Sequence, residues 1–204
     1  MKQTYLKVSI YYDYICPWCY IGQIVAKRLQ SEYGALLDWK PFLLHPHIPL
    51  EGKFMTQEER ESKFEMFEKV TQIANANNLP IVFPNRMIYT KLAIEATEYA
   101  RERGRVCAFN EAVFHKLYGK GKDISNWEVL AQVAVESGLD PEDMRRRVEG
   151  GNYTEFVEKQ FIEAEERGID SLPTYILNDS YAIVGAQPFE VFELVLDRMT
   201  QECR

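Results

Sequence analysis

Cys16-Pro17-Trp18-Cys19 decides the fold of this chain: it follows an apolar run at residues 5–12 and precedes a helical pattern at residues 21–29. Two cysteines with two residues between them, at a junction of strand and helix, can close a disulfide within one turn of chain. The first thiol would lie at a helix N-terminus, where unpaired N–H groups and the helix dipole favour a thiolate. Pro17 suits the first helical position because its φ is already helical. The pattern is typical of a redox-active dithiol.

The alternative for these two cysteines is half of a structural zinc site. Such a site needs four ligands, and the sequence holds neither a second CxxC nor an HxxxH pair. His45 and His47 are the only histidines nearby in the sequence, and their spacing fits a zinc site poorly. We therefore expect redox chemistry and no metal.

The composition is that of a globular protein with a substantial core. Hydrophobic residues make up 46% of the 204 residues, so neither a metal nor disulfides are needed for stability. Acidic residues outnumber basic ones by 31 to 24, which gives a net charge of −7. Because no basic stripe is present, we expect no nucleic-acid partner.

The sequence also predicts where the protein works. Residues 1–7 lack an apolar signal core, and no run is long enough to span a bilayer, so we expect no membrane association. Four cysteines, two of them in one CxxC, do not form the disulfide framework of a secreted domain. We expect a cytoplasmic protein, in a compartment where a dithiol is mostly kept reduced.

The hydrophobic pattern divides the chain into an interrupted α/β unit and a helical block. Residues 5–43 read as strand, helix and strand, and residues 173–199 as two strands and a helix. From Thr56, which opens a capping box with Glu59, the pattern is helical to about residue 167. We therefore predict one discontinuous domain, residues 1–50 and 168–204, and an inserted helical domain, residues 51–167.

Four stretches resemble the DsbA-like branch of the thioredoxin fold, and within it the cytosolic FrnE-type dithiol oxidoreductases. They are Cys16-Pro17-Trp18-Cys19-Tyr20-Ile21-Gly22, Trp39-Lys40-Pro41-Phe42-Leu43, Gly168-Ile169-Asp170-Ser171-Leu172-Pro173-Thr174 and Val184-Gly185-Ala186-Gln187-Pro188. The resemblance spans nearly the whole chain and implies an α/β fold, a thioredoxin fold with a large all-helical insertion.

The same resemblance implies roles for the matching residues. Cys16 would be the attacking thiolate and Cys19 the resolving thiol. Pro173 would be a cis-proline that faces the dithiol, and the backbone at Leu172 would pair with a bound peptide. The position of Leu172 departs from the family pattern, in which we expect a smaller, β-branched residue.

Further side chains in or near the tetrad Cys16-Pro17-Trp18-Cys19 have two interpretations each. Pro17 and Trp18 pack at the start of the helix, and they also shape the environment of the thiolate. Asp13 is either a polar turn residue at the end of a strand or a group that handles protons for the resolving thiol. Of the remaining cysteines, we interpret Cys107 as a small buried hydrophobe and Cys203 as an exposed thiol at a frayed end.

The leading functional hypothesis is thiol–disulfide exchange or isomerisation through a mixed-disulfide intermediate. Its substrates would be proteins or peptides that contain disulfides, or small disulfides. No cofactor would be tightly bound, and glutathione or another cellular dithiol would be the redox partner. The sequence leaves open how many copies of the chain assemble.

Two other functions remain open. The hydroxychromene-carboxylate isomerases and the kappa-class glutathione transferases share the fold and the insertion, and they use glutathione as a bound cofactor. These enzymes typically carry serine at the first active-site position, so the presence of both Cys16 and Cys19 counts against this hypothesis. A binding module without exchange chemistry is the third hypothesis, and the intact CxxC disfavours it.

Overall fold

The sheet of the predicted thioredoxin fold is present in the computed structural model, which describes residues 5–202. The sheet has four strands in the order β2-β1-β5-β6. The bounds are β1 Lys7–Tyr12, β2 Leu36–Pro41, β5 Thr174–Leu177 and β6 Tyr181–Val184. β1 runs parallel to β2 and antiparallel to β5, so the two ends of the chain meet in one sheet. After its first residue β1 is buried throughout, as expected for a central strand covered on both faces.

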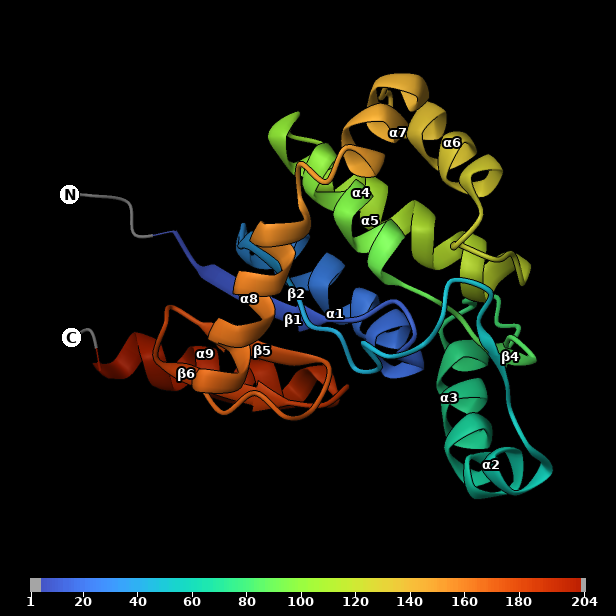
Figure 1. The fold of residues 1–204 in the computed structure, drawn as a ribbon. Helices are drawn as coiled ribbons and strands as arrows, with labels where there is room; N and C mark the ends of the chain where they lie inside the picture. Colours follow the sequence, from blue (N-terminus) through green and yellow to red (C-terminus); the bar gives the residue numbers. More distant parts are fainter. Residues whose placement is uncertain (1–4, 203–204) are drawn as a thin grey trace.

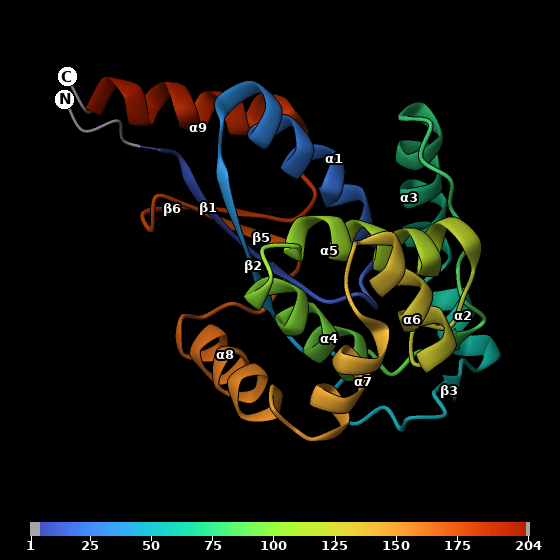
Figure 2. The same ribbon diagram turned by 90° about the horizontal axis from the view of Figure 1, so that it is seen from above.

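Helices cover both faces of this sheet. α1 spans Pro17–Tyr33 and α9 spans Phe189–Glu202. Figure 2 shows α1 and α9 on one side and α8, Thr154–Glu166, on the other. α1 ends at Gly34, whose φ of 63° is the left-handed conformation that glycine adopts at no steric cost. The tetrad therefore lies between the central strand and the N-terminus of the helix that follows it.

The insertion is helical except for one small sheet. Its elements before α8 are α2 Gln57–Ser62, α3 Phe64–Ala76, α4 Lys91–Glu102, α5 Val106–Phe114, the π-helix η1 His115–Gly119, α6 Trp127–Glu136 and α7 Pro141–Glu149. The exception is the antiparallel pair β3 Lys53–Phe54 and β4 Arg86–Met87, which corrects the prediction of an all-helical insertion. Strands of two residues are too short to produce an alternating pattern in the sequence. Figure 1 shows α4 to α7 in one group and α2 with α3 in another.

Aromatic side chains join the insertion to the sheet next to the turn that precedes Cys16. The ring of Tyr14 packs edge-on against Tyr12 of β1 and against Phe114 of α5, with centroid distances of 5.2 and 4.8 Å. The Tyr14 hydroxyl shares a buried 2.6 Å hydrogen bond with Thr97 of α4. The turn between β1 and α1 is therefore held by the sheet and by the insertion together.

Candidate active site

Cys16 is the residue at which α1 begins. Its backbone is extended, with φ −84° and ψ 110°, and Pro17 occupies the first helical position. The N–H groups of Cys19 and Tyr20 donate to the Cys16 carbonyl over 3.0 and 3.4 Å, which closes the first turn. Cys16 is 6% exposed and Cys19 1% exposed, and neither forms a disulfide. Cys16 is therefore the more exposed of the two residues.

Cys19 is a buried thiol that stays protonated. Burial raises its pKa well above the usual value, and a hydrogen bond to the Cys16 side chain and the charge of that residue act in the same direction. A thiol in this state attacks a disulfide only after a base removes its proton.

The segment before β5 faces the dithiol. The peptide bond between Leu172 and Pro173 is cis. The Cys16 thiol donates to the Leu172 carbonyl, with 3.7 Å between sulfur and oxygen. Pro173 also packs against α1, because a side chain on Gly22 would come within 3.3 Å of its ring. Residues 156 positions apart thus meet at the reacting sulfur.

Asp13 is a fully buried carboxyl at the end of β1. One of its side-chain oxygens accepts from the N–H of Ile15 over 3.2 Å, and the other accepts from the N–H of Leu44 over 2.8 Å. Burial raises its pKa from 3.8 to about 6, and the backbone hydrogen bonds keep the pKa from rising further. Asp13 is thus a turn residue, as one interpretation of the sequence held, and it also titrates close to neutral pH.

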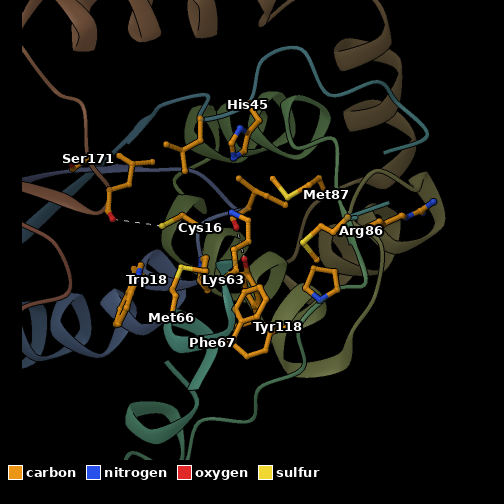
Figure 3. Close-up of a pocket in the computed structure, with 17 residues that line it drawn as sticks. Cys16, Trp18, His45, Lys63, Met66, Phe67, Arg86, Met87, Tyr118 and Ser171 are labelled. Atoms are coloured by element: carbon orange, nitrogen blue, oxygen red, sulfur yellow. Dashed lines mark hydrogen bonds between the residues drawn. The ribbon is translucent and has the colours of Figure 1, made fainter. Parts of the chain in front are cut away.

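A cavity of about 320 Å³ opens beside the first cysteine. Figure 3 shows Cys16 and Trp18 on one side of it and side chains of the insertion on the other. Its lining residues are Ile15, Cys16, Pro17, Trp18, Leu44, His45, Met55, Lys63, Met66, Phe67, Phe83, Pro84, Arg86, Met87, Tyr118, Ser171 and Leu172. The structure therefore brings four of the proposed site residues to one wall. Cys19, Asp13 and Pro173 are buried and do not line the cavity.

The insertion supplies most of the cavity wall that sequence reasoning missed. Phe67 lies on the apolar face of α3, which helical periodicity could have identified as a surface awaiting a partner. Tyr118 lies in the π-helix η1, and its hydroxyl donates to the Ile15 carbonyl over 2.6 Å. No pattern in the sequence signals that this tyrosine reaches the turn before the tetrad.

Cys107 is not part of the candidate site. Cys107 is half-buried, does not line the cavity, and has its pKa raised mainly by burial. Cys203 lies outside the described residues.

Within residues 5–202, no group of three His, Cys, Asp or Glu side chains is arranged to hold a metal ion. In the same part of the chain, no helix combines the length and the apolar character that crossing a membrane requires.

Comparison with known proteins identifies the family. Residues 7–197 match the model of the DSBA-like thioredoxin domain, and the chain belongs to this family. The protein is 29% identical over 190 residues to the uncharacterized protein YwbO of Bacillus subtilis, an alignment that covers 91% of this chain and 93% of that protein.

Two further relatives bear on the chemistry. The crystal structure of a probable DsbA oxidoreductase from Streptomyces coelicolor aligns with a TM-score of 0.84 and 25% identity, over 97% of this chain and 91% of that chain. The 2-hydroxychromene-2-carboxylate isomerase of Sphingobium xenophagum is 24% identical over 179 residues, which cover 84% of this chain and 89% of the isomerase. The thioredoxin fold with its helical insertion is thus shared with proteins of two reaction classes.

Proposed function

We propose that this chain is a thiol–disulfide oxidoreductase of the FrnE type, in which Cys16 attacks the substrate and Cys19 resolves the intermediate. The observation that carries the proposal is the position of the two thiols. Cys16 begins α1 on the wall of a cavity, whereas Cys19 is buried one turn further along the same helix. A nucleophile on a cavity wall followed by a fully enclosed second thiol is the arrangement that two-step exchange needs.

The reaction transfers two electrons from the dithiol to the substrate. The Cys16 thiolate attacks one sulfur of the substrate disulfide, which forms a mixed disulfide and releases the first substrate thiolate. Cys19, once deprotonated, attacks the Cys16 sulfur, breaks the mixed disulfide and releases the second thiolate. The Cys16–Cys19 disulfide that results is reduced again by glutathione or another cellular thiol, and no tightly bound cofactor takes part.

Asp13 is the base that we assign to the second step. A carboxyl with a pKa of about 6 is largely ionised at neutral pH and can accept a proton. The charge of Asp13 is also among the causes that raise the pKa of Cys19, so the two groups are close enough to interact electrostatically.

The neighbours of the dithiol have supporting roles in this proposal. Pro17 and Trp18 shape the environment of the Cys16 thiolate. The Leu172 carbonyl accepts from the Cys16 thiol in the free protein. It would be released to pair with substrate backbone once Cys16 is in a mixed disulfide. We place this activity in the cytoplasm, on disulfides of proteins, peptides or small molecules.

Trapping the intermediate tests the proposal. Cys19→Ala should accumulate an adduct on Cys16, because no second thiol is held nearby to release the substrate. Intact-mass measurement after incubation with glutathione disulfide should show one added glutathione, which dithiothreitol removes. Cys16→Ser should form no adduct and lose disulfide reduction, since a hydroxyl cannot replace the thiolate. Cys107→Ala is the matched control and should behave as the unmodified protein; absence of adduct in Cys19→Ala would contradict the proposal.

A glutathione-dependent isomerase is the second candidate, and the similarity to the isomerase of Sphingobium xenophagum favours it. In such an enzyme the second cysteine is dispensable, and glutathione acts as a cofactor that is not covalently attached. Turnover of 2-hydroxychromene-2-carboxylate with glutathione, undiminished in Cys19→Ala, would support it. Without that activity, adduct formation by Cys19→Ala assigns the site to exchange.

A further inference from the structure

The cavity beside Cys16 has the size and the walls of a small-molecule site. Its volume of about 320 Å³ lies at the lower end of the roughly 300–1,000 Å³ typical of ligand pockets. Met55, Met66 and Met87 line it together with Phe67 and Phe83. Methionine side chains are flexible and polarizable, so such walls adapt to apolar groups of different shapes.

The cavity walls carry basic side chains and no acidic ones. The chain as a whole carries a net charge of −7, yet no aspartate or glutamate is among the residues that line the cavity. Three basic residues do line it: His45, Lys63 and Arg86. An anionic group that entered would therefore meet basic side chains, and no acidic side chain lines the cavity.

Of these three residues, Arg86 and His45 are not available as free cations. Arg86 forms a salt bridge with Asp123 and donates to the Glu51 carbonyl over 2.9 Å. The pKa of His45 is lowered from its usual 6.5, first by burial and then by the charge of Lys63, so the imidazole is mostly neutral at pH 7.

Lys63 is the cation without a partner. Within residues 5–202 its amine makes no salt bridge and no hydrogen bond, although the side chain is half-buried. Lys63 lies at the junction of α2 and α3, and Figure 3 shows its side chain extending into the cavity. Lys53, in the groove that adjoins the cavity, is by contrast bonded to Glu59 over 2.8 Å. An ammonium group at an apolar wall gains most from an anion that binds beside it.

We propose that this cavity admits small disulfides that carry an anionic group on an apolar body, with Lys63 pairing with the anion. This inference rests on the proposed exchange function and names the class of its substrates. The apolar body contacts the methionines and phenylalanines, the anion contacts Lys63, and the disulfide lies against Cys16. One turnover converts the reduced dithiol and one disulfide into the Cys16–Cys19 disulfide and two small thiols, so the step is balanced without another reactant.

Single-turnover oxidation of the reduced protein tests the inference. The probes are dithiodipropionate, hydroxyethyl disulfide and cystamine, which carry carboxylates, hydroxyls and ammonium groups on similar short chains. Dithiobis(nitrobenzoate) adds an aromatic body to the carboxylate. Each rate constant is divided by the rate constant of the same probe with free dithiothreitol, which removes the intrinsic reactivity of the probe. We expect the corrected rate to be about tenfold higher for dithiodipropionate than for cystamine, and higher still for the aromatic probe.

Two substitutions at Lys63 and one matched control test whether Lys63 causes the preference for anionic probes. Lys63→Met should reduce the ratio of anionic to cationic rates to near one, and Lys63→Glu should invert it. The control Lys69→Met removes an exposed lysine from α3, the helix that follows Lys63, and should keep the ratio of the unmodified protein. The ratio is the measured quantity because a change in the reactivity of Cys16 would alter both rates equally.

Failure of the inference and failure of the exchange function give different results. If no probe oxidises the dithiol, the exchange function itself is wrong. If all probes react at similar corrected rates, or if Lys63→Met keeps the preference for anions, exchange stands and the role of Lys63 is overturned. A disulfide-containing peptide that reacts much faster than every small probe would overturn the small-molecule assignment, because the cavity would then receive a side chain of a larger substrate.

Discussion

The Asp13 carboxyl fixes the turn before Cys16 and also has a pKa of about 6. Its two oxygens accept from two different backbone N–H groups, of Ile15 and Leu44, and an asparagine could accept only one of these bonds. The carboxylate is thus suited to the turn, but full burial disfavours its charge and raises its pKa to about 6. The group that closes the turn before the tetrad is consequently a base within reach of physiological pH.

This titration should be visible in the stability of the protein. The pKa of Asp13 is raised on folding, so the folded state binds the proton more tightly than the unfolded state. The contribution is favourable while both states are protonated, and it is lost as pH rises from about 4 to about 6. The two-unit difference corresponds to about 3 kcal/mol. Between pH 4 and pH 7 the unmodified protein should therefore lose about 3 kcal/mol of unfolding free energy that Asp13→Asn does not lose. The unfolding free energy of both proteins is measured with urea at each pH.

The comparison across pH isolates the ionisation from the lost hydrogen bond. Asparagine leaves one backbone N–H without its acceptor at every pH, so that cost cancels in the difference between two pH values. A constant difference between variant and unmodified protein from pH 4 to pH 7 would show that Asp13 does not titrate in this range. In the same variant, release of a mixed disulfide by Cys19 should slow at pH 7, whereas attack by Cys16 should be little changed.

At the scale of elements, α1 and β5 approach each other so closely that only glycine fits between them. A side chain on Gly22 would collide with the hydroxyl of Tyr175 and come within 3.3 Å of the Pro173 ring. The same Tyr175 hydroxyl donates to the Gly22 carbonyl over 3.1 Å. This approach fixes the helix that carries both cysteines against the strand that follows Pro173.

Gly22→Ala should therefore destabilise the protein although alanine is the better helix former. Helix propensity favours the substitution by about 1 kcal/mol, and overpacking opposes it by about 1–3 kcal/mol. We expect a net loss of up to about 2 kcal/mol in urea unfolding. Gln30→Ala, at an exposed position of the same helix, should change stability by less than about 0.5 kcal/mol. Adding Tyr175→Phe removes the colliding oxygen and should recover part of the loss. A double variant no more stable than Gly22→Ala would refute this explanation.

The elements themselves were largely predictable, and the cavity was not. Pro17 after a strand-like run, Gly34 after a helical pattern and the capping box at Thr56 are local signals, and each marks a boundary that the structure has. The walls of the cavity depend instead on packing between segments that lie far apart in the sequence. Nothing in the local sequence indicates that Lys63 lines the cavity, and Tyr118 reaches its position through a π-helix, which the hydrophobic pattern does not reveal.

At the scale of the whole molecule, one arginine ties the insertion to the edge of the sheet. Arg101 of α4 donates to Glu98 over 2.6 Å, to Asp38 of β2 over 3.0 Å and to the Trp39 carbonyl. Glu98 is 3% exposed, and burial raises its pKa while Arg101 acts to lower it. These bonds fix α4 of the insertion against the edge strand β2.

Removing that arginine should destabilise the fold through the charge it leaves behind. Arg101→Met deprives the nearly buried Glu98 of its cation, and breaking such a pair costs about 3–5 kcal/mol. The exposed Arg105→Met is the matched control and should stay within about 0.5 kcal/mol of the unmodified protein in urea unfolding.

Two further measurements show that charge, and not lost packing, is the cause. Glu98→Gln combined with Arg101→Met removes the unpaired carboxylate and should recover much of the loss, whereas lost packing would not be recovered.

The loss in Arg101→Met should also grow as pH rises, because a carboxyl whose pKa is raised on folding destabilises the folded state once it ionises. Exchange activity per folded molecule should stay near normal, since Arg101 does not line the cavity. A loss below about 1 kcal/mol, independent of pH, would mean that the apolar core alone joins the insertion to the sheet.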